Sequence, residues 1–249
     1  MLDRMILSNR ASHVRKRIGA DNVSQVDVFT LVCALENVTF VKYPLGHKIS
    51  GACLKCNGST VIAVNSSMSL GRQRFSLAHE LHHYYYDEDT GSIICPMDLV
   101  GRSKVERAAN QFASYLLMPQ AALYNEILEI KAAGNRRLTV ETVVKLEQYF
   151  GVSRHAMVIR LQQEGEISES EAERMQKGVI RSAARLGYDT SLYKPTPENE
   201  NKRTYGHYIK QAVKALQSGA VSTGKYEEWL LDAFRDDIVY GEEVEGGID

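Results

Sequence analysis

Residues 72–87 read RQRFSLAHELHHYYYD and have the apolar periodicity of a helix. His79 and His83 are four residues apart, so a helix places both imidazoles on one face, one turn apart. Ring nitrogens in that arrangement can bind one metal ion at about 2.0–2.1 Å. Glu80 is rotated by about 100° from His79 around the helix axis, which leaves its carboxylate free to act on a metal-bound water. This division of labour, with two ligands and a general base on one helix, is typical of a zinc peptidase.

A catalytic zinc ion usually takes three protein ligands and one water molecule, so the histidine pair needs a further partner. Asp87 follows His83 by four residues. The side chains of His79, His83 and Asp87 would then form a line about 12 Å long on the helix. Because ligands have to surround an ion, we expect Asp87 to orient a ligand histidine through a hydrogen bond instead.

A second helix, predicted over residues 104–118, offers a better candidate for the third ligand. It carries Glu106, and the small Ala109 and Ala113 on the flank of Glu106 allow a close approach to the first helix. Asn110 lies one turn after Glu106, where its side chain can hydrogen-bond the outer nitrogen of a ligand histidine. The residues alone therefore favour Glu106 as the third metal ligand.

Residues 38–43 are rich in β-branched and aromatic residues, and residues 49–55 and 61–64 are two further candidates for short strands. Asn57-Gly58 separates the last two and favours a hairpin, since both residues tolerate positive φ. We expect a short antiparallel or mixed sheet with helices before and after it. The predicted fold class is therefore α+β.

The chain divides into three predicted parts. They are a small zincin-like domain over 1–134, a helix-turn-helix-like module over 135–166, and a helical C-terminal region with a disordered acidic tail over 167–249. In the module one helix is expected to end at Phe150, with Gly151 making the turn to the next helix. Residues 187–204, which include Pro195 and Pro197, are expected to form an exposed linker.

The composition excludes several classes of protein. The 30 basic residues nearly balance the 31 acidic ones, which gives no overall attraction to nucleic acid or to anionic membranes. No apolar run reaches the roughly 18 residues of a membrane helix, and none resembles a signal-peptide core. We therefore expect a cytoplasmic protein. Its four cysteines are expected to be free thiols, because four cysteines in a chain of this length do not make a disulfide framework. Cys53 and Cys56 would point to opposite faces of a strand, which is unfavourable for binding one metal ion.

Two blocks of the sequence resemble the ImmA/IrrE metallopeptidases. The first is residues 72–83, RQRFSLAHELHH. The second is residues 106–119, ERAANQFASYLLMP, which is similar to that family's E-x-x-A-N-x-F-A helix ending in L-L-M-P. The resemblance covers about half of the chain, residues 35–163, and includes the order of the motifs as well as their content.

This resemblance implies a zincin fold and a Zn²⁺ cofactor. Carried over residue by residue, it gives the metal ligands as His79 and His83, the third ligand as Glu106 and the general base as Glu80. The sequence departs from the family at His82, where members commonly have glycine. This difference puts a further imidazole next to the site.

The resemblance also implies a zinc metalloendopeptidase that cleaves a specific intracellular protein. Family members act in bacteria and mobile elements, often beside a helix-turn-helix repressor that some of them cleave. The expected substrate is therefore a transcriptional repressor of the XRE type, or an antitoxin-like partner, encoded nearby. The alternative hypothesis is a non-catalytic regulatory or binding module on the same fold, although such a module has no need for Glu80.

Residues 138–163 have the pattern of a helix-turn-helix. Side chains on its second helix are positioned for contact with DNA in such a motif, namely Arg154, His155, Arg160, Gln162 and Gln163. The preceding helix carries the acidic Glu141 and Glu147, which oppose an approach to phosphates. We therefore expect a module that packs against the peptidase, with DNA binding as the less favoured alternative.

Overall fold

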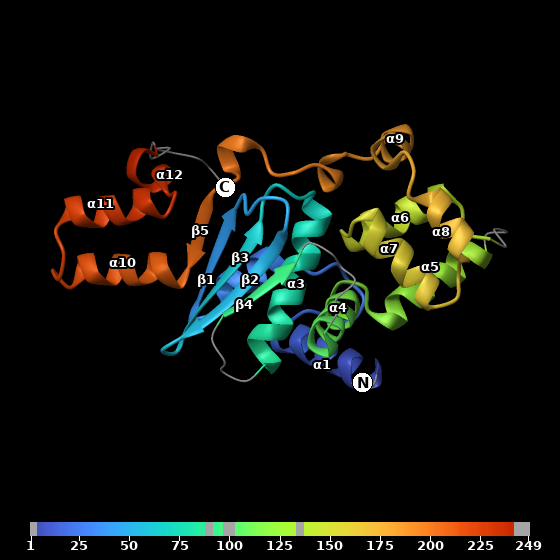
Figure 1. Cartoon of the computed structure of the whole chain (residues 1–249), viewed down its shortest axis with the longest axis horizontal. Coiled ribbons are helices and arrows are strands. Elements are labelled where there is room, and N and C mark those ends of the chain that lie inside the picture. The colour runs from blue at the N-terminus through green and yellow to red at the C-terminus, as the bar shows by residue number, and fades with distance from the viewer. Residues whose placement is uncertain (1–3, 88–91, 97–102, 133–136, 242–249) are drawn as a thin grey trace.

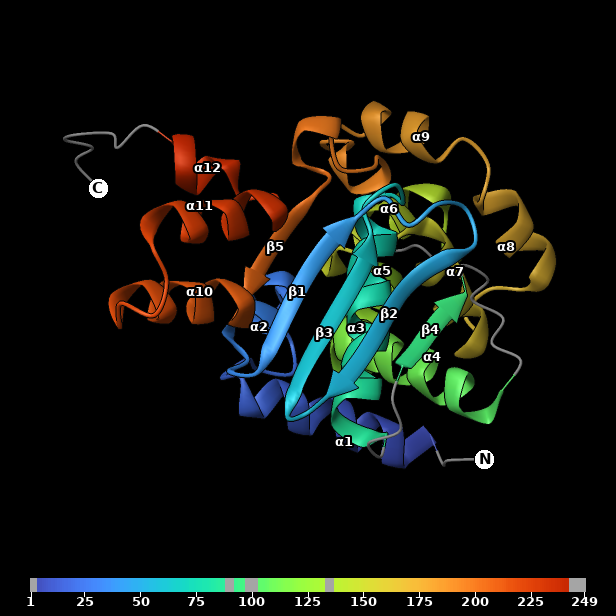
Figure 2. The ribbon, with the colours of Figure 1, turned by 60° about the vertical axis from the view of Figure 1, so that its left-hand side comes forward.

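The computed structural model describes residues 4–87, 92–96, 103–132 and 137–241. Its centre is a five-stranded sheet with the strand order β4-β2-β3-β1-β5. The strands are β1 (Val38–Tyr43), β2 (Ile49–Cys56), β3 (Ser59–Asn65), β4 (Ser92–Pro96) and β5 (Arg203–Gly206). Helices cover one face of this sheet, and further helices extend from both of its sides (Figures 1 and 2).

The sheet is mixed. β2 and β3 form the predicted antiparallel hairpin, and Asn57 and Gly58 adopt φ values of 49° and 79° at its turn. β1 pairs with β3 in parallel, while β4 and β5 add antiparallel partners at the two edges. The predicted α+β class is thus confirmed, and of the two sheet types that were expected the mixed one is present.

One buried helix, α3 (Leu70–Tyr86), lies across the covered face of the sheet. Alternate residues of the strands point toward it, among them the fully buried Ile62 and Val64. They pack into one apolar core with Leu77 and Leu81 of α3. Because nearly every side chain from Gly71 to His83 is buried, the sequence of α3 is constrained around its whole circumference.

Three further helices complete this layer, namely α1 (Arg4–Arg17), α2 (Val28–Ala34) and α4 (Lys104–Leu117). α4 packs beside α3, and α1 packs on α4. The N-terminal cap of α4 is Ser103, whose hydroxyl accepts a hydrogen bond from Glu106 N at 3.0 Å. The fully buried Ala109 and Ala113 lie within α4, in agreement with the close helix approach predicted from their size.

A second group of helices follows the sheet domain. It consists of α5 (Gln120–Ala132), α6 (Val140–Phe150), α7 (Arg154–Gln163), α8 (Glu169–Met175) and α9 (Val179–Arg185). Gly151 ends α6 in the left-handed conformation, with φ 64°, as its place after Phe150 predicted. Its carbonyl accepts a hydrogen bond from Arg74 Nε of α3 at 2.8 Å, which ties this group to the buried helix.

The segment expected to be an exposed linker, residues 187–204, is mostly exposed as predicted, and it is also bound to the sheet domain. Leu70 N donates to Lys194 O at 2.9 Å, and the buried Gln73 amide lies 3.0 Å from Thr196 Oγ1. β5 then pairs with β1 over Thr39–Lys42, although the sequence predicted no strand there. The reason is that a run of only four residues, ending in glycine, gives too little pattern to predict a strand and becomes one when an open sheet edge accepts its hydrogen bonds.

The chain ends in helices that project from β5 (Figure 1). They are α10 (His207–Gln217), α11 (Thr223–Asp232) and α12 (Asp236–Tyr240). The first two agree with the helices expected near 205–218 and 222–236, whereas α12 was not predicted. The predicted disordered tail and the predicted domain boundary at residue 134 lie outside the described residues, so the three-part division stays a prediction. Within the described ranges no helix is both long and apolar enough to span a bilayer.

The contact between α3 and the α6–α7 turn gives a prediction. A Cβ atom on Gly71 would lie 2.6 Å from Ser153 N and 2.9 Å from Val152 C, both of them backbone atoms. We expect Gly71→Ala to lower the free energy of unfolding by about 1–3 kcal/mol, because the turn has to move. Gly224→Ala in α11 is the control, since its Cβ would meet open space and should gain about 0.5–1 kcal/mol of helix stability. Guanidinium unfolding followed by circular dichroism measures both; equal midpoints for the two variants would contradict the prediction.

Candidate metal centre

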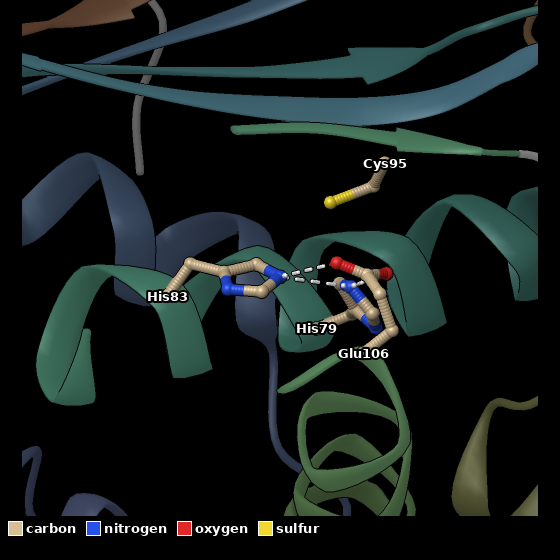
Figure 3. A group of neighbouring side chains, drawn as sticks. All are labelled: His79, His83, Cys95 and Glu106. Atoms are coloured by element: carbon tan, nitrogen blue, oxygen red, sulfur yellow. Dashed lines mark hydrogen bonds and ion pairs between the residues drawn. The ribbon is translucent and has the colours of Figure 1, made fainter. Parts of the chain in front are cut away.

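Three side chains from two helices converge on one buried point (Figure 3). His79 Nε2 and His83 Nε2 face each other at 3.0 Å. The carboxylate of Glu106, which comes from α4, lies 3.3 Å from His79 Nε2 and 3.6 Å from His83 Nε2. The structure therefore brings together the three residues that the sequence proposed as metal ligands.

The outer nitrogen of each ring is held by an acceptor. His79 Nδ1 donates to Asn110 Oδ1 at 2.8 Å, and His83 Nδ1 donates to an oxygen of Asp87 at 2.6 Å. Asp87 is also the C-terminal cap residue of α3, so the end of the helix is defined by the residue that orients its last imidazole. Asn110 and Asp87 thus occupy the orienting positions expected for them, and neither enters the centre itself.

These hydrogen bonds decide where the lone pairs of the rings point. Because both Nδ1 atoms carry hydrogen toward an acceptor, both neutral rings direct an Nε2 lone pair at the same place. The Glu106 carboxylate adds negative charge there, and this contact and the charge of Glu80 raise the pKa of His79 against the opposing effect of burial. Positive charge is therefore favoured at this point.

The spacing of the donors fits a tetrahedral metal ion. Two ligands bound at 2.0–2.1 Å with a tetrahedral angle between them are about 3.3 Å apart. The separations of 3.0 to 3.6 Å among the two Nε2 atoms and the two oxygens of the Glu106 carboxylate bracket that value. Two imidazoles and one carboxylate are also the ligand chemistry of catalytic zinc sites, so the residues present fit the ion.

Glu80 lies beside this centre and is fully buried between α3 and the sheet. Its Oε2 accepts a hydrogen bond from Cys95 Sγ at 3.4 Å, whereas its Oε1 has no hydrogen-bond partner among the described residues. Burial raises the pKa of Glu80 to about 7. A Cβ on Gly51 of β2 would come within 2.6 Å of Oε1, so the absence of a side chain there makes room for the carboxylate.

His82 does not take part in the three-residue centre. Its ring packs against Phe112 and Tyr86, with centroids 5.4 and 5.5 Å away, and burial lowers its pKa to about 4. Neither ring nitrogen has a hydrogen-bond partner among the described residues, and the nearest Asp87 oxygen is 3.8 Å from Nδ1. His82 is thus a neutral core residue, in agreement with the expectation that it turns away from the ligand face.

Cys95 is the one member of this neighbourhood that the sequence did not indicate. It lies on β4, and its Sγ, the ligand nitrogens of His79 and His83 and a Glu106 oxygen all lie within 4.8 Å of one another. In Figure 3 its sulfur points from the strand toward the other three side chains. No spacing rule relates Cys95 to the helix motif, because only the position of β4 in the sheet brings the two together.

Two of the side chains considered for DNA contact are buried in α7. Arg154 forms two hydrogen bonds with Glu147 at 2.7 and 2.8 Å and a third with Met175 O at 2.7 Å. Arg160 is fully buried and bonds Ser114 Oγ of α4 at 3.0 Å. These guanidinium groups cannot reach phosphates, and they join α7 to its neighbours instead.

Comparison with known families identifies the same part of the chain. A model of the M78 peptidases, described as the IrrE N-terminal-like domain, matches residues 27–162, which is more than half of the chain. The matched span contains α3 and α4 with the complete centre, as well as the α6–α7 turn. A comparison with curated protein sequences gave no match.

The unpaired ring of His82 leads to a prediction about stability. A buried polar group without partners costs about 1–3 kcal/mol, so His82→Leu should raise the free energy of unfolding by about 1 kcal/mol. Thermal unfolding in the presence of a chelator measures this effect without a contribution from bound metal. A clear loss of stability would mean that the ring makes a hydrogen bond that the structure does not have.

Proposed function

The chain belongs to the M78 family of metallopeptidases, that of the IrrE N-terminal-like domain, and from this membership we propose that it uses zinc to cleave one specific protein. The observation that carries the proposal is the convergence of His79, His83 and Glu106 beside a buried, unpartnered oxygen of Glu80. The three converging residues hold the ion, and Glu80 is the general base. Zinc bound there supplies a water of pKa near 7 and polarises the scissile carbonyl.

Glu80 is suited to moving a proton in both directions. Its Oε1 is free to take a proton from the attacking water, since no described residue occupies it. A pKa of about 7 lets the same carboxyl group hold that proton and then pass it to the leaving amine. Burial, which keeps other water away, is what sets this value.

The sheet offers a place for the substrate chain. β4 is the last strand on its side of the sheet, and in the described residues only β2 pairs with it. An extended segment of the substrate can add to the free edge of β4 through backbone hydrogen bonds. Because β4 also carries Cys95, a peptide on this edge runs next to the centre.

For the substrate we favour a helix-turn-helix repressor of the XRE type, or an antitoxin-like protein, encoded by a neighbouring gene. The support is the resemblance of the two sequence blocks to ImmA/IrrE peptidases, some of which cleave such repressors. The test is to incubate the purified chain and the neighbouring repressor with zinc, with and without a chelator, and to read the products by mass spectrometry. A single cut that the chelator abolishes is expected, and an intact repressor under all conditions contradicts this choice of substrate.

Glu80→Gln separates peptidase activity from binding. The variant should keep its zinc content, because Glu80 is not a ligand, and should lose at least about 10²-fold in cleavage rate, because it cannot take a proton. His79→Ala is expected to lose both zinc and cleavage, whereas His82→Leu is expected to keep both. Metal analysis and the repressor assay measure the outcome. If every biological effect survives in Glu80→Gln, the non-catalytic binding hypothesis is favoured.

Gly51→Ala tests whether the position of the Glu80 carboxylate matters. The added methyl group would lie 2.6 Å from Oε1 and has to displace it. Misplacing a reacting group by about 1 Å can cost about 10²-fold in rate, so we expect a loss of that order in kcat at unchanged zinc content. Gly224→Ala, far from the centre, should leave kcat and zinc content unchanged, and an unaffected kcat in Gly51→Ala would contradict the role given to Gly51.

A further inference from the structure

Cys95 is placed in the centre by the sheet. Its strand neighbour on β2 is Gly51, whose missing side chain leaves space for the Glu80 carboxylate that Cys95 Sγ contacts. The thiol is fully buried and bonds Glu80 Oε2 at 3.4 Å, and its backbone oxygen accepts from Ser50 Oγ at 3.2 Å. The sulfur therefore has a defined position between the general base and the three proposed ligands.

The distances put Cys95 within reach of the metal position. Its Sγ lies within 4.8 Å of each of the three donor atoms of His79, His83 and Glu106. Sulfur at 2.3 Å and nitrogen at 2.0–2.1 Å from a tetrahedral zinc ion are about 3.6 Å apart. A shift of the sulfur by about 1 Å is thus sufficient for coordination.

The consequence of a contact between Cys95 Sγ and the metal ion depends on the number of protein ligands. Catalytic zinc sites have three protein ligands and an open position for water, whereas sites closed by four protein ligands are structural. Thiolate is also among the most favourable ligands for zinc. A sulfur that reaches the ion therefore takes the position that the attacking water requires.

We infer that Cys95 is a fourth protein ligand, which closes the zinc site and keeps the peptidase latent until the sulfur withdraws. The inference rests on the proposed function, since it needs zinc bound by His79, His83 and Glu106. When the sulfur binds, the S–H bond breaks, the proton passes along the existing hydrogen bond to Glu80 Oε2, and one water molecule leaves the ion. The same step protonates Glu80. The site then lacks both the bound water and a general base that can accept a proton, so cleavage is blocked.

Cobalt substitution tests the sulfur ligand without any substrate. Co²⁺ is added to the metal-free full-length protein, and the absorption spectrum is recorded. A bound thiolate gives an intense near-ultraviolet charge-transfer band that nitrogen and oxygen ligands do not give. We expect the band in the unmodified protein and its loss in Cys95→Ser. Cys53→Ser is the matched control, because Cys53 is a buried thiol on the neighbouring strand and should leave the band unchanged.

Two further measurements use the same proteins. Zinc affinity should fall by about 10- to 100-fold in Cys95→Ser, since losing a direct ligand costs at least as much as losing one that orients a ligand. Acetohydroxamate, a small ligand for zinc and cobalt, should bind Cys95→Ser and shift its cobalt spectrum at concentrations that leave the unmodified protein unchanged. That difference reports whether the metal position is closed.

The possible outcomes are distinguishable. If the unmodified protein binds one equivalent of cobalt without the charge-transfer band, the inference about Cys95 is wrong and the three-ligand site stands. If the band persists in Cys95→Ser, another thiol is responsible and the inference is again wrong. If the protein binds neither cobalt nor zinc, the proposed metallopeptidase function fails, and the inference fails with it.

Discussion

The metal centre depends on one unfavourable interaction, the repulsion between the lone pairs of two imidazole nitrogens and a carboxylate that lie close together in a buried space. The Nε2 atoms of His79 and His83 face each other at 3.0 Å with a carboxylate beside them. Each ring is kept in place from its far side, by Asn110 or by Asp87. Beside them, Glu80 Oε1 has no hydrogen-bond partner among the described residues, and an unsatisfied buried polar group costs about 1–3 kcal/mol, which the apolar packing of α3 and α4 has to exceed. A bound cation converts the same repulsion into attraction.

The helix α3, which carries both histidines, also contacts several other parts of the fold. One side of the helix faces the sheet, where Gly51 makes room for Glu80, and another faces α4, which brings Glu106. Its first turns hold later parts of the chain, because Arg74 binds the Gly151 carbonyl and Gln73 binds Thr196. The buried helix is therefore the common support of the metal centre, the α6–α7 turn and the segment that leads to β5.

The sequence predicted what depends on local spacing. The histidines one turn apart, the hairpin at Asn57-Gly58 and the turn at Gly151 follow from the geometry of single elements. β4 and β5 were missed, because short edge strands depend on a partner strand rather than on their own residues. Cys95 was missed for the same reason, since it reaches the centre only through the pairing of β4 with β2. The attachment of residues 187–204 to the sheet domain was not predicted, because their partners in α3 lie far away in the chain.

Burial removes several charged side chains from contact with solvent, and most of them are arginines. Four buried arginines hydrogen-bond to neighbouring elements, namely Arg15, Arg74, Arg154 and Arg160. Arg15 binds the Leu116 carbonyl at 2.6 Å, which joins α1 to α4. Only two carboxylates, Glu80 and Glu147, are comparably buried in the described ranges, so burial there removes two more positive than negative charges from contact with solvent. These buried guanidinium groups therefore serve the packing of the helices and are not available to bind phosphates at the surface.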